Sequence, residues 1–220
     1  MIRALAILVM LSVVTGALFL IRPQIDLDAA ALFYRDGGFY LAHHPLVQFL
    51  YHYSPLFAVL TGTAALLLWM LSLVLKRDLF GVSKRVWAYL LLALLLGPGL
   101  IVNLLLKEHW GRARPIQIEQ FGGDKQFTPP LVIAHQCNHN CSFPSGHASA
   151  GFYFIAPALL ARRRRWLWLT LAVLFGFLVG WGRMAQGGHF LSDVIFSFLF
   201  VAISSLFLYW LIFGRKGAVK

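Results

Sequence analysis

The chain has 220 residues, of which 60% are hydrophobic and only 12% are charged, and its mean hydropathy is +0.74. This composition excludes an ordinary soluble domain and predicts an integral membrane protein, because about a quarter of the residues in a typical soluble chain are charged. The formal net charge is +11. Basic residues collect in the cytoplasmic loops of membrane proteins, and no soluble segment combines a basic stripe with aromatic residues, so we do not expect a nucleic-acid partner.

Six apolar segments predict six membrane spans and therefore an all-α, polytopic helix bundle in which residues 1–220 form a single domain. The fourth segment is short and rich in small residues, and a Gly-Pro-Gly sequence at 97–99 predicts a kink in the third. Residues 22–50 are too charged to span and predict interfacial structure. The six predicted spans are Ala4–Ile21, Pro55–Leu75, Val86–Leu106, Ser145–Leu160, Trp166–Trp181 and Leu191–Phe213.

The distribution of lysine and arginine predicts the orientation of the bundle. Six spans put both termini on one side, and 12 of the 19 basic residues lie at the termini or in the loops on that side. The positive-inside rule places this side in the cytoplasm, so the loops 22–54, 107–144 and 182–190 face outward, into the periplasm of a bacterium with the protein in its inner membrane. The 12 residues are Arg3, Lys76, Arg77, Lys84, Arg85, Arg162, Arg163, Arg164, Arg165, Arg215, Lys216 and Lys220.

Cys137 and Cys141 are the only cysteines, and both fall in an outer loop. An oxidising compartment permits a disulfide across this short spacing. The alternative is a metal site that combines the two thiolates with His135 and His139, although thiolates in the periplasm are usually oxidised. We favour the disulfide, which would hold the loop just before the fourth span.

Three polar segments lie at the outer ends of the predicted spans and therefore at one depth in the bundle. The first, Lys107–Pro115, carries three cations, a density suited to an anion. The second, Ser142–Gly151, begins a helix with Pro-Ser-Gly-His, whose backbone N–H groups can form a phosphate cradle. The third, Gly182–Asp193, places His189 four residues before Asp193, so that the carboxylate can reach the imidazole. Each segment alone is also typical of a helix cap or an interfacial anchor.

Together the three segments offer two histidines, an orienting carboxylate, a backbone cradle and several cations. This set suits the transfer of a phosphoryl group through a covalent phosphohistidine, in which one histidine attacks phosphorus and the other protonates the leaving oxygen. The cations, Lys107, Arg114 and Arg183 foremost, neutralise the phosphate oxygens. No carboxylate cluster for two metal ions is present, so a mechanism without metal or cofactor is the simpler interpretation.

The three segments resemble the motifs of the type 2 phosphatidic acid phosphatase (PAP2) superfamily: Lys-x6-Arg-Pro, Pro-Ser-Gly-His and Ser-Arg-x5-His-x3-Asp. There is one departure, since Gly182 stands where the family usually has serine. The resemblance implies that His189 is the nucleophile and that Asp193 orients it. It implies that His147 is the general acid and then the base that activates water. The residues implied to bind phosphate are Lys107, Arg114, Ser145, Gly146 and Arg183.

A closer resemblance is to the lipid A 4′-phosphatase branch of the superfamily. Members of that branch remove the phosphate from the distal glucosamine of lipid A at the periplasmic face of the inner membrane. The resemblance implies a phosphorylated lipid as partner and offers residues 119–125 either as contacts to the sugar headgroup or as a plain surface loop. It is carried by Lys107–Pro115, Glu119–Lys125, Gln136–Phe143 and Ala185–Phe190.

The sequence therefore predicts a metal-independent membrane lipid phosphatase, with lipid A as the favoured substrate. Undecaprenyl pyrophosphate, phosphatidylglycerophosphate and phosphatidate are alternative substrates for the same chemistry, and transfer to a lipid acceptor is an alternative to hydrolysis. A protein that binds or transports anionic lipid is an alternative from another class. Such a protein needs cations but no nucleophile, so the pair of histidines with Asp193 favours the enzyme. The sequence predicts no particular oligomeric state.

Overall fold

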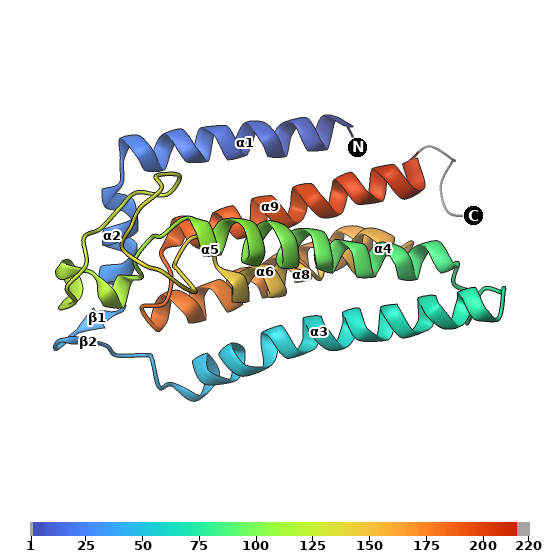
Figure 1. Ribbon diagram of the computed structural model, residues 1–220, viewed down its shortest axis with the longest axis horizontal. Coiled ribbons are helices and arrows are strands. Elements are labelled where there is room, and N and C mark those ends of the chain that lie inside the picture. Colours follow the sequence, from blue (N-terminus) through green and yellow to red (C-terminus); the bar gives the residue numbers. More distant parts are fainter. Residues whose placement is uncertain (1, 215–220) are drawn as a thin grey trace.

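A computed structural model describes residues 2–214, and in it the long helices run side by side along one axis (Figure 1). Within this range, five helices are long and apolar enough to cross a membrane. The chain is thus a multi-pass membrane protein, and the predicted all-α bundle is confirmed. The five are α1 (Ile2–Ile21), α3 (Pro45–Val74), the continuous helix Lys84–His109 of α4 (Lys84–Leu94), η1 (Leu95–Leu106) and α5 (Lys107–His109), α8 (Arg165–Ala185), and the helix Leu191–Gly214 of α9 (Leu191–Tyr209) and η4 (Trp210–Gly214).

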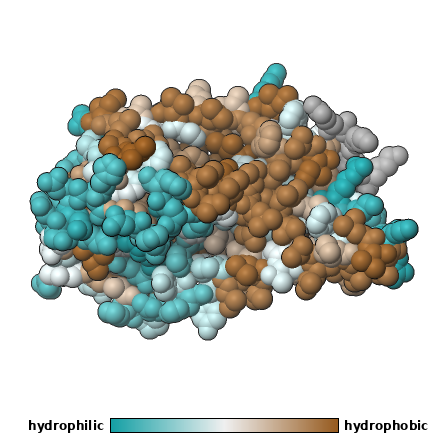
Figure 2. Space-filling view, viewed as in Figure 1, coloured by the Kyte–Doolittle hydropathy of each residue, from teal (hydrophilic) through white to brown (hydrophobic). Residues whose placement is uncertain are grey.

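Most of the short elements gather at one end of the bundle, opposite the end where α1 begins (Figure 1). Figure 2 shows hydrophilic residues over this end and hydrophobic residues over the sides of the long helices, as expected for a polar cap above a membrane-embedded belt. The cap contains α2 (Gln24–Ala31), an antiparallel hairpin of β1 (Tyr34–Arg35) and β2 (Gly38–Phe39), and the 3₁₀ turns η2 (Pro115–Gln117) and η3 (Glu119–Phe121).

The predicted fourth span is two short helices, α6 (Gly146–Phe152) and α7 (Ile155–Leu160), rather than one. Pro157 explains the break, because in a continuous helix its ring would clash with the carbonyl of Tyr153 and it has no N–H to donate. The last five residues of α6 are buried, so the break is enclosed by protein, where irregular backbone is tolerated at membrane depth.

The pair α6–α7 still traverses the bundle. The N–H of Ser145, just before α6, donates to the carbonyl of Asp193 at the capped end over 3.2 Å. Leu160, at the end of α7, lines a cavity with Asp78 and Arg165 at the opposite end. Six crossings place the start of α1 and the end of η4 at the same end (Figure 1). Arg215, Lys216 and Lys220, which entered the predicted orientation, lie outside the described residues.

Helix α3 begins at Pro45, ten residues before the predicted start of the second span. The side chain of His44 caps it, since Nδ1 accepts the Leu46 N–H over 3.3 Å. Pro55 lies inside the helix instead of at its start, which membrane helices tolerate. Residues 45–50 therefore belong to the same helix as the second predicted span, and this extension carries Tyr51 up to the polar cap.

The predicted irregularity in the third span is present as a stretch of π-helix, η1, which contains Pro98. Proline cannot donate the usual backbone hydrogen bond, and a wider helical turn accommodates its ring. The carbonyl of Pro98 accepts a hydrogen bond of 2.7 Å from the Asn103 side chain. The helix nevertheless continues to His109, so that Lys107 is held at the rim of the cap.

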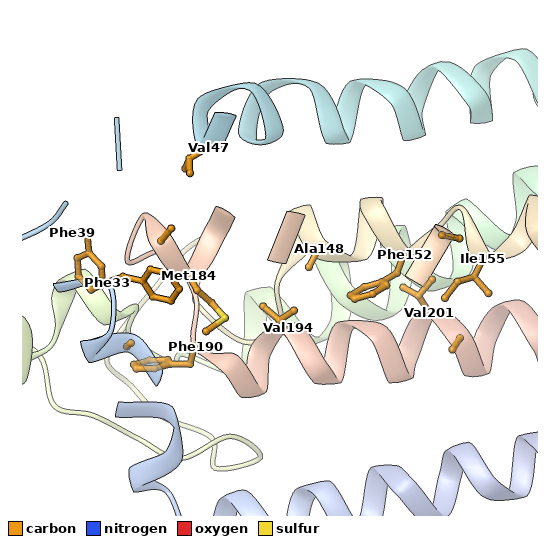
Figure 3. Packing of buried hydrophobic residues seen from close by; sticks show 14 of the residues in the cluster. Phe33, Phe39, Val47, Ala148, Phe152, Ile155, Met184, Phe190, Val194 and Val201 are labelled. Carbon is orange, nitrogen blue, oxygen red and sulfur yellow. The ribbon is translucent and has the colours of Figure 1, made fainter. Parts of the chain in front are cut away.

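Small residues allow α8 to lie close to its neighbours, as is usual where packing rather than water drives helix association. A Cβ at Gly176 would overlap the Phe152 ring of α6, and one at Gly180 would overlap Val194 of α9. The core formed in this way is continuous from Phe39 in the hairpin to Val201 in α9 (Figure 3). The cap and the membrane bundle thus share one core.

We expect Gly176→Ala to lower the free energy of unfolding by about 1–3 kcal/mol, because the added methyl group must displace the Phe152 ring from a packed core. The midpoint of thermal unfolding in detergent measures this effect. Gly182→Ala on the same helix is the control, since its Cβ would lie 3.4 Å from Leu50 Cδ1, an ordinary van der Waals distance. Equal midpoints for the two variants would contradict the close packing of α6 on α8.

Candidate active site

The three predicted motif segments meet beneath the polar cap. Lys107 begins α5, Ser145 is the N-cap of α6, and Arg183 lies in the last turn of α8. His189 lies in the loop between α8 and α9, and Asp193 is in the first turn of α9. Lys107 and Arg183 are only 5% and 6% exposed, so both cations are buried, as are His189 and Asp193.

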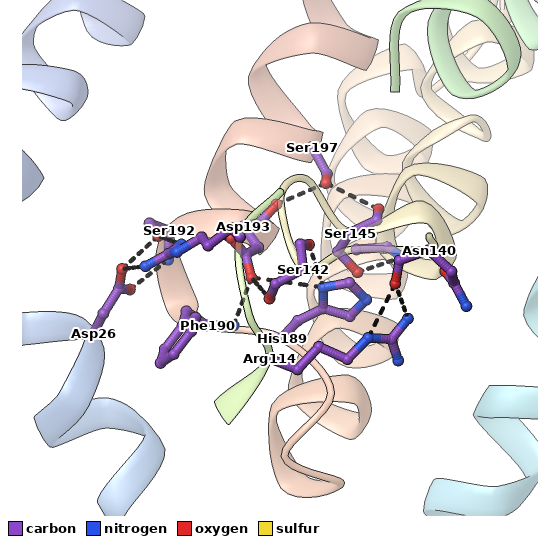
Figure 4. Close-up of polar contacts among 12 residues, drawn as sticks. Asp26, Arg114, Asn140, Ser142, Ser145, His189, Phe190, Ser192, Asp193 and Ser197 are labelled. Atoms are coloured by element: carbon purple, nitrogen blue, oxygen red, sulfur yellow. Dashed lines mark hydrogen bonds and ion pairs between the residues drawn. The ribbon is translucent and has the colours of Figure 1, made fainter. Parts of the chain in front are cut away.

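The imidazole of His189 is buried and has one defined tautomer. Nδ1 lies 2.7 Å from the carbonyl oxygen of Ser142 (Figure 4). A carbonyl oxygen only accepts hydrogen bonds, so Nδ1 carries the proton and Nε2 keeps its lone pair. Nε2 is buried and makes no hydrogen bond to any of residues 2–214. The ring therefore presents an unprotonated nitrogen, which is the atom that a nucleophilic histidine uses.

Asp193 contacts His189, but less directly than the sequence suggested. Its Oδ2 lies 3.6 Å from Nδ1 of His189, an ion-pair distance rather than a hydrogen bond. The same oxygen accepts the Ser142 hydroxyl at 2.5 Å and the Phe190 N–H at 2.8 Å. Asp193 thus holds the segments on both sides of the imidazole, and the Ser142 carbonyl provides the direct hydrogen bond to the ring. Ser142 is a site residue that the motif match alone did not single out.

The surroundings of His189 keep its imidazole neutral. Burial lowers the pKa of His189 well below its usual value of 6.5, and the positive charges of Lys107 and Arg183 lower it further. Asp193 acts in the opposite direction and raises this pKa, but burial is the larger effect. A neutral imidazole at physiological pH is the form that can attack phosphorus.

Tyr51, which the sequence analysis missed, connects two of the predicted site residues. Its ring stacks on the His147 ring with centroids 4.7 Å apart and an interplanar angle of 14°. The guanidinium of Arg183 lies over the same Tyr51 ring, 4.7 Å from its centroid. Tyr51 therefore forms a platform for His147 and Arg183. A sequence signal was lacking because Tyr51 lies in an apolar helix far along the chain from both motifs.

Arg114 is held by the loop that the two cysteines close. Cys137 and Cys141 are joined in a disulfide with 5.6 Å between their Cα atoms, so the thiols are not metal ligands in this structure. The loop carbonyl of Asn140 accepts two hydrogen bonds from the guanidinium of Arg114, at 2.6 and 3.2 Å (Figure 4). The disulfide loop thus positions a predicted phosphate ligand, which deepens the role expected for it.

Ser145 and Gly146 occupy the junction between the disulfide loop and α6. The Ser145 hydroxyl accepts the Ala148 N–H over 3.4 Å, which leaves its own proton available for an oxygen ligand. A Cβ on Gly146 would lie 2.5 Å from Oδ1 of Asn103, so a larger residue here would have to displace the Asn103 side chain. At Gly182, by contrast, a Cβ would make only ordinary contacts with Leu50, so the position has room for the usual serine.

Arg112 does not act as the sequence suggested. It was counted with Lys107 and Arg114 as a cation for an anionic ligand, but its guanidinium is fully buried and faces two carboxylates. Nη1 lies 2.6 Å from Asp193 Oδ1, and Nη2 lies 2.8 Å from Asp26 Oδ2. The sequence analysis also missed Asp26, because a single acidic residue in a mixed segment carries no motif.

The chain matches one known protein family and several known proteins. Residues 85–217 match the model of the PAP2 superfamily. The chain belongs to the PAP2 superfamily. It is 39% identical over 202 residues to a lipid A 4′-phosphatase of Francisella tularensis subsp. novicida. The aligned region covers 90% of this chain and 90% of the relative. No solved structure gives a significant match.

Two further relatives match over shorter parts of the chain. The chain is 42% identical over 107 residues to a lipid A 4′-phosphatase of Rhizobium leguminosarum, covering 48% of this chain and 46% of the relative. It is 28% identical over 146 residues to phosphatidylglycerophosphatase B of Bacillus subtilis, covering 62% of each. The PAP2 family and the phosphatases among its relatives show that this protein is a phosphatase, and its long apolar helices show that it is a membrane protein.

We expect Tyr51→Leu to lower the rate of phosphate release roughly two- to tenfold, because an aromatic stack is worth about 0.5–1.5 kcal/mol and its loss frees the His147 ring. Tyr51→Phe keeps the ring and should retain most of the rate. The control is Tyr53→Leu on the same helix, whose side chain is exposed. The rates of phosphate release from a lipid phosphate in detergent test the platform, and a full rate for Tyr51→Leu would contradict it.

Proposed function

We propose that this PAP2 protein is a metal-independent lipid A 4′-phosphatase that acts at the periplasmic face of the bacterial inner membrane, with both termini in the cytoplasm. The observation that carries the chemistry is the buried, unprotonated Nε2 of His189, held by the Ser142 carbonyl. Lys107 and Arg183, whose charges reach His189, supply attraction for the phosphate. The whole chain acts as one domain, since Asp26 from the N-terminal part contacts α9.

In the first step, the lone pair of Nε2 of His189 attacks phosphorus. The bond between phosphorus and the sugar oxygen breaks, and that oxygen takes a proton from His147. Lys107, Arg114 and Arg183 neutralise the non-bridging oxygens while the transferred group passes between the two atoms. The products are a dephosphorylated lipid and a phosphohistidine whose Nδ1–H still faces the Ser142 carbonyl.

In the second step, a water molecule attacks the phosphohistidine. Neutral His147 accepts a proton from this water, the P–N bond breaks, and its electron pair returns to Nε2 of His189. Inorganic phosphate leaves, and both histidines regain their starting states. A lipid hydroxyl in the place of water would give phosphotransfer instead of hydrolysis.

A groove next to His147 supports a lipid as substrate. It has a volume of about 330 Å³ and lies between α3 and the helix that contains η1. Lys107 and His147 line its polar end, and Pro55, Val59 and Leu95 line the part among the membrane helices. A phosphate at the polar end would therefore be continuous with an apolar chain along the helices.

Two features favour lipid A over other lipid phosphates. The first is the 39% identity over 90% of the chain to a protein named as a lipid A 4′-phosphatase. The second is the cap, in which Phe121 packs against Tyr34 and Phe39 of the hairpin beside Gly187 of the nucleophile loop. This arrangement keeps residues 119–125 close to the catalytic loop, where a sugar headgroup would lie.

Phosphatidylglycerophosphate is the second candidate substrate, because a relative that is 28% identical over 62% of the chain is named phosphatidylglycerophosphatase B. Expression in a host with bisphosphorylated lipid A distinguishes the two. Mass spectrometry should find lipid A that lacks one phosphate, and fragmentation should place the remaining phosphate at the 1-position. Unchanged lipid A together with hydrolysis of phosphatidylglycerophosphate would overturn the first substrate.

We expect His189→Ala to lower phosphate release from lipid A by at least about 1,000-fold, because the nucleophile is lost. Asp193→Asn should lower the rate by at least about tenfold, because the neutral amide holds the imidazole and Ser142 less firmly. The matched control for the first change is His43→Ala at an exposed histidine of the cap. A full rate in His189→Ala with inserted protein would exclude His189 as the nucleophile.

We expect EDTA to leave the rate of phosphate release unchanged, because the buried cations supply the charge that a divalent ion would otherwise supply. The measurement compares the initial rates of purified protein with and without the chelator. Loss of activity that returns on addition of a divalent ion would show that the reaction needs a metal.

A further inference from the structure

Protein groups occupy almost all of the hydrogen-bond donors of the Arg112 guanidinium. Nε donates to the carbonyl of Thr128 over 2.8 Å, Nη1 donates to Asp193 and to Ser192 Oγ, and Nη2 donates to Asp26. Four of its five N–H groups are used in this way. The side chain is 0% exposed, so Arg112 is separated from the phosphate-binding cations of the same motif.

Two aromatic rings enclose the charged plane of Arg112. Its Cζ lies 4.3 Å from the ring centroid of Phe190 and 5.5 Å from that of Phe127. Contact with aromatic faces favours a cation, and burial strengthens the effect. The rings also fix the orientation of the guanidinium, so its hydrogen bonds to Asp193 have little freedom.

Asp26 of α2 is the second carboxylate of this network. It is 0% exposed, and its Oδ1 accepts the backbone N–H of Ser192 at 2.8 Å. Its Oδ2 accepts the Ser192 hydroxyl at 2.5 Å and the Arg112 guanidinium at 2.8 Å (Figure 4). The N–H of Ser192 belongs to the first turn of α9, where helical donors lack intrahelical partners. Asp26 thus caps the helix that carries Asp193.

Burial raises the pKa of Asp26, whereas Arg112 and the Ser192 hydroxyl lower it. Both oxygens of Asp26 accept hydrogen bonds, as those of an ionised carboxylate do. With both carboxylates ionised and a single guanidinium between them, the network carries one excess negative charge. Asp193 faces Arg112 through Oδ1 and faces His189 through Oδ2. When Nε2 of His189 bonds to phosphorus, the ring gains positive charge while Nδ1 keeps its proton. An ionised Asp193 at 3.6 Å stabilises that charge. If Arg112 were paired with Asp193 alone, it would cancel much of this effect.

We propose that Arg112 and Asp26 are positioning residues for the nucleophile: Arg112 holds Asp193 ionised and in place behind His189, and Asp26 shares the charge of Arg112 so that Asp193 stays negative toward the imidazole. Neither side chain touches the substrate. Asp26 lies outside residues 85–217, the part that matches the family, so the N-terminal segment adds this element to the catalytic centre. The proposal rests on the proposed phosphohistidine chemistry.

The test uses the full-length protein in detergent micelles with bisphosphorylated lipid A as substrate. The variants are Asp26→Asn, which keeps the shape of the side chain, and Arg112→Lys, which keeps the charge but not the fork of donors. The matched control is Asp28→Asn, because Asp28 lies on the same helix, is exposed, and accepts a hydrogen bond from Gln24. The readouts are kcat, KM, the inhibition constant of inorganic phosphate and the midpoint of thermal unfolding.

We expect kcat to fall about tenfold or more in Asp26→Asn and in Arg112→Lys, because each change weakens charge-assisted hydrogen bonds that act on Asp193. KM and the inhibition constant of phosphate should stay within about twofold of the parent, because the anion-binding cations are untouched. Asp28→Asn should match the parent in every readout. A role in folding alone would lower the amount of active protein, and kcat would then equal that of the parent once rates are divided by the folded fraction.

Two results would overturn the proposal. One is a kcat within about twofold of the parent in both variants after rates are divided by the folded fraction. The other is a rise in KM and in the inhibition constant of phosphate with kcat unchanged, which would place Arg112 in anion binding.

If the parent protein leaves lipid A intact, the substrate assignment fails. The same kcat and KM comparisons, measured with phosphatidylglycerophosphate as substrate, then decide whether Arg112 and Asp26 are positioning residues. If His189→Ala keeps the parent rate, the phosphohistidine fails and so does this inference.

Discussion

The arrangement of the site depends on the ion pair between Arg112 and Asp193, which is fully buried at the capped end of the bundle. Removing one partner of such a pair leaves an uncompensated buried charge, at a cost of roughly 3–5 kcal/mol. Asp26 and Ser192 extend this network by accepting further hydrogen bonds from the guanidinium. A buried pair of this kind is weak evidence for stability but strong evidence for fixed geometry.

Two groups of Asp193 connect this fixed geometry to His189. Its side chain binds the Ser142 hydroxyl, and its main-chain carbonyl accepts the Ser145 N–H. The carbonyl of Ser142 in turn binds the imidazole of His189. One residue of α9 therefore aligns the segment before α6 with the loop that carries His189. The electrostatics of the site follow, because burial and the positive charges of Lys107 and Arg183 keep the imidazole neutral.

The membrane explains why these groups are placed at the end of the helices. Along the bundle, α8 and α9 pack through glycines and aromatic rings with few charges, and the charged groups lie where α6, α8 and α9 begin or end. Backbone donors without intrahelical partners occur only at helix termini, and buried ionisable groups there can find such partners. The groove between α3 and η1 joins this polar end to the apolar sides of the bundle.

The sequence by itself determined the class of the fold and most of the proposed chemistry. Long apolar segments allow only helices in a membrane, and the motif residues lie at the ends of those segments, so Lys107, His147 and His189 were expected to meet. The sequence analysis did not predict the break in the fourth span or the early start of α3. Whether a proline such as Pro157 interrupts a helix depends on the packing around it. The residues after Pro45 are amphipathic rather than uniformly apolar, so they did not read as part of a span.

Only the tertiary structure decided which partners the buried charges have. Arg112 and Arg114 are two residues apart in the same motif, yet one faces Asp26 and Asp193 while the other binds the Asn140 carbonyl. Tyr51 likewise became part of the site only when α3 packed beside α6. Spacing along the chain specifies which residues share a helix end. The direction in which each side chain points depends on packing between segments that are distant in sequence, and a single sequence does not encode it as a local pattern.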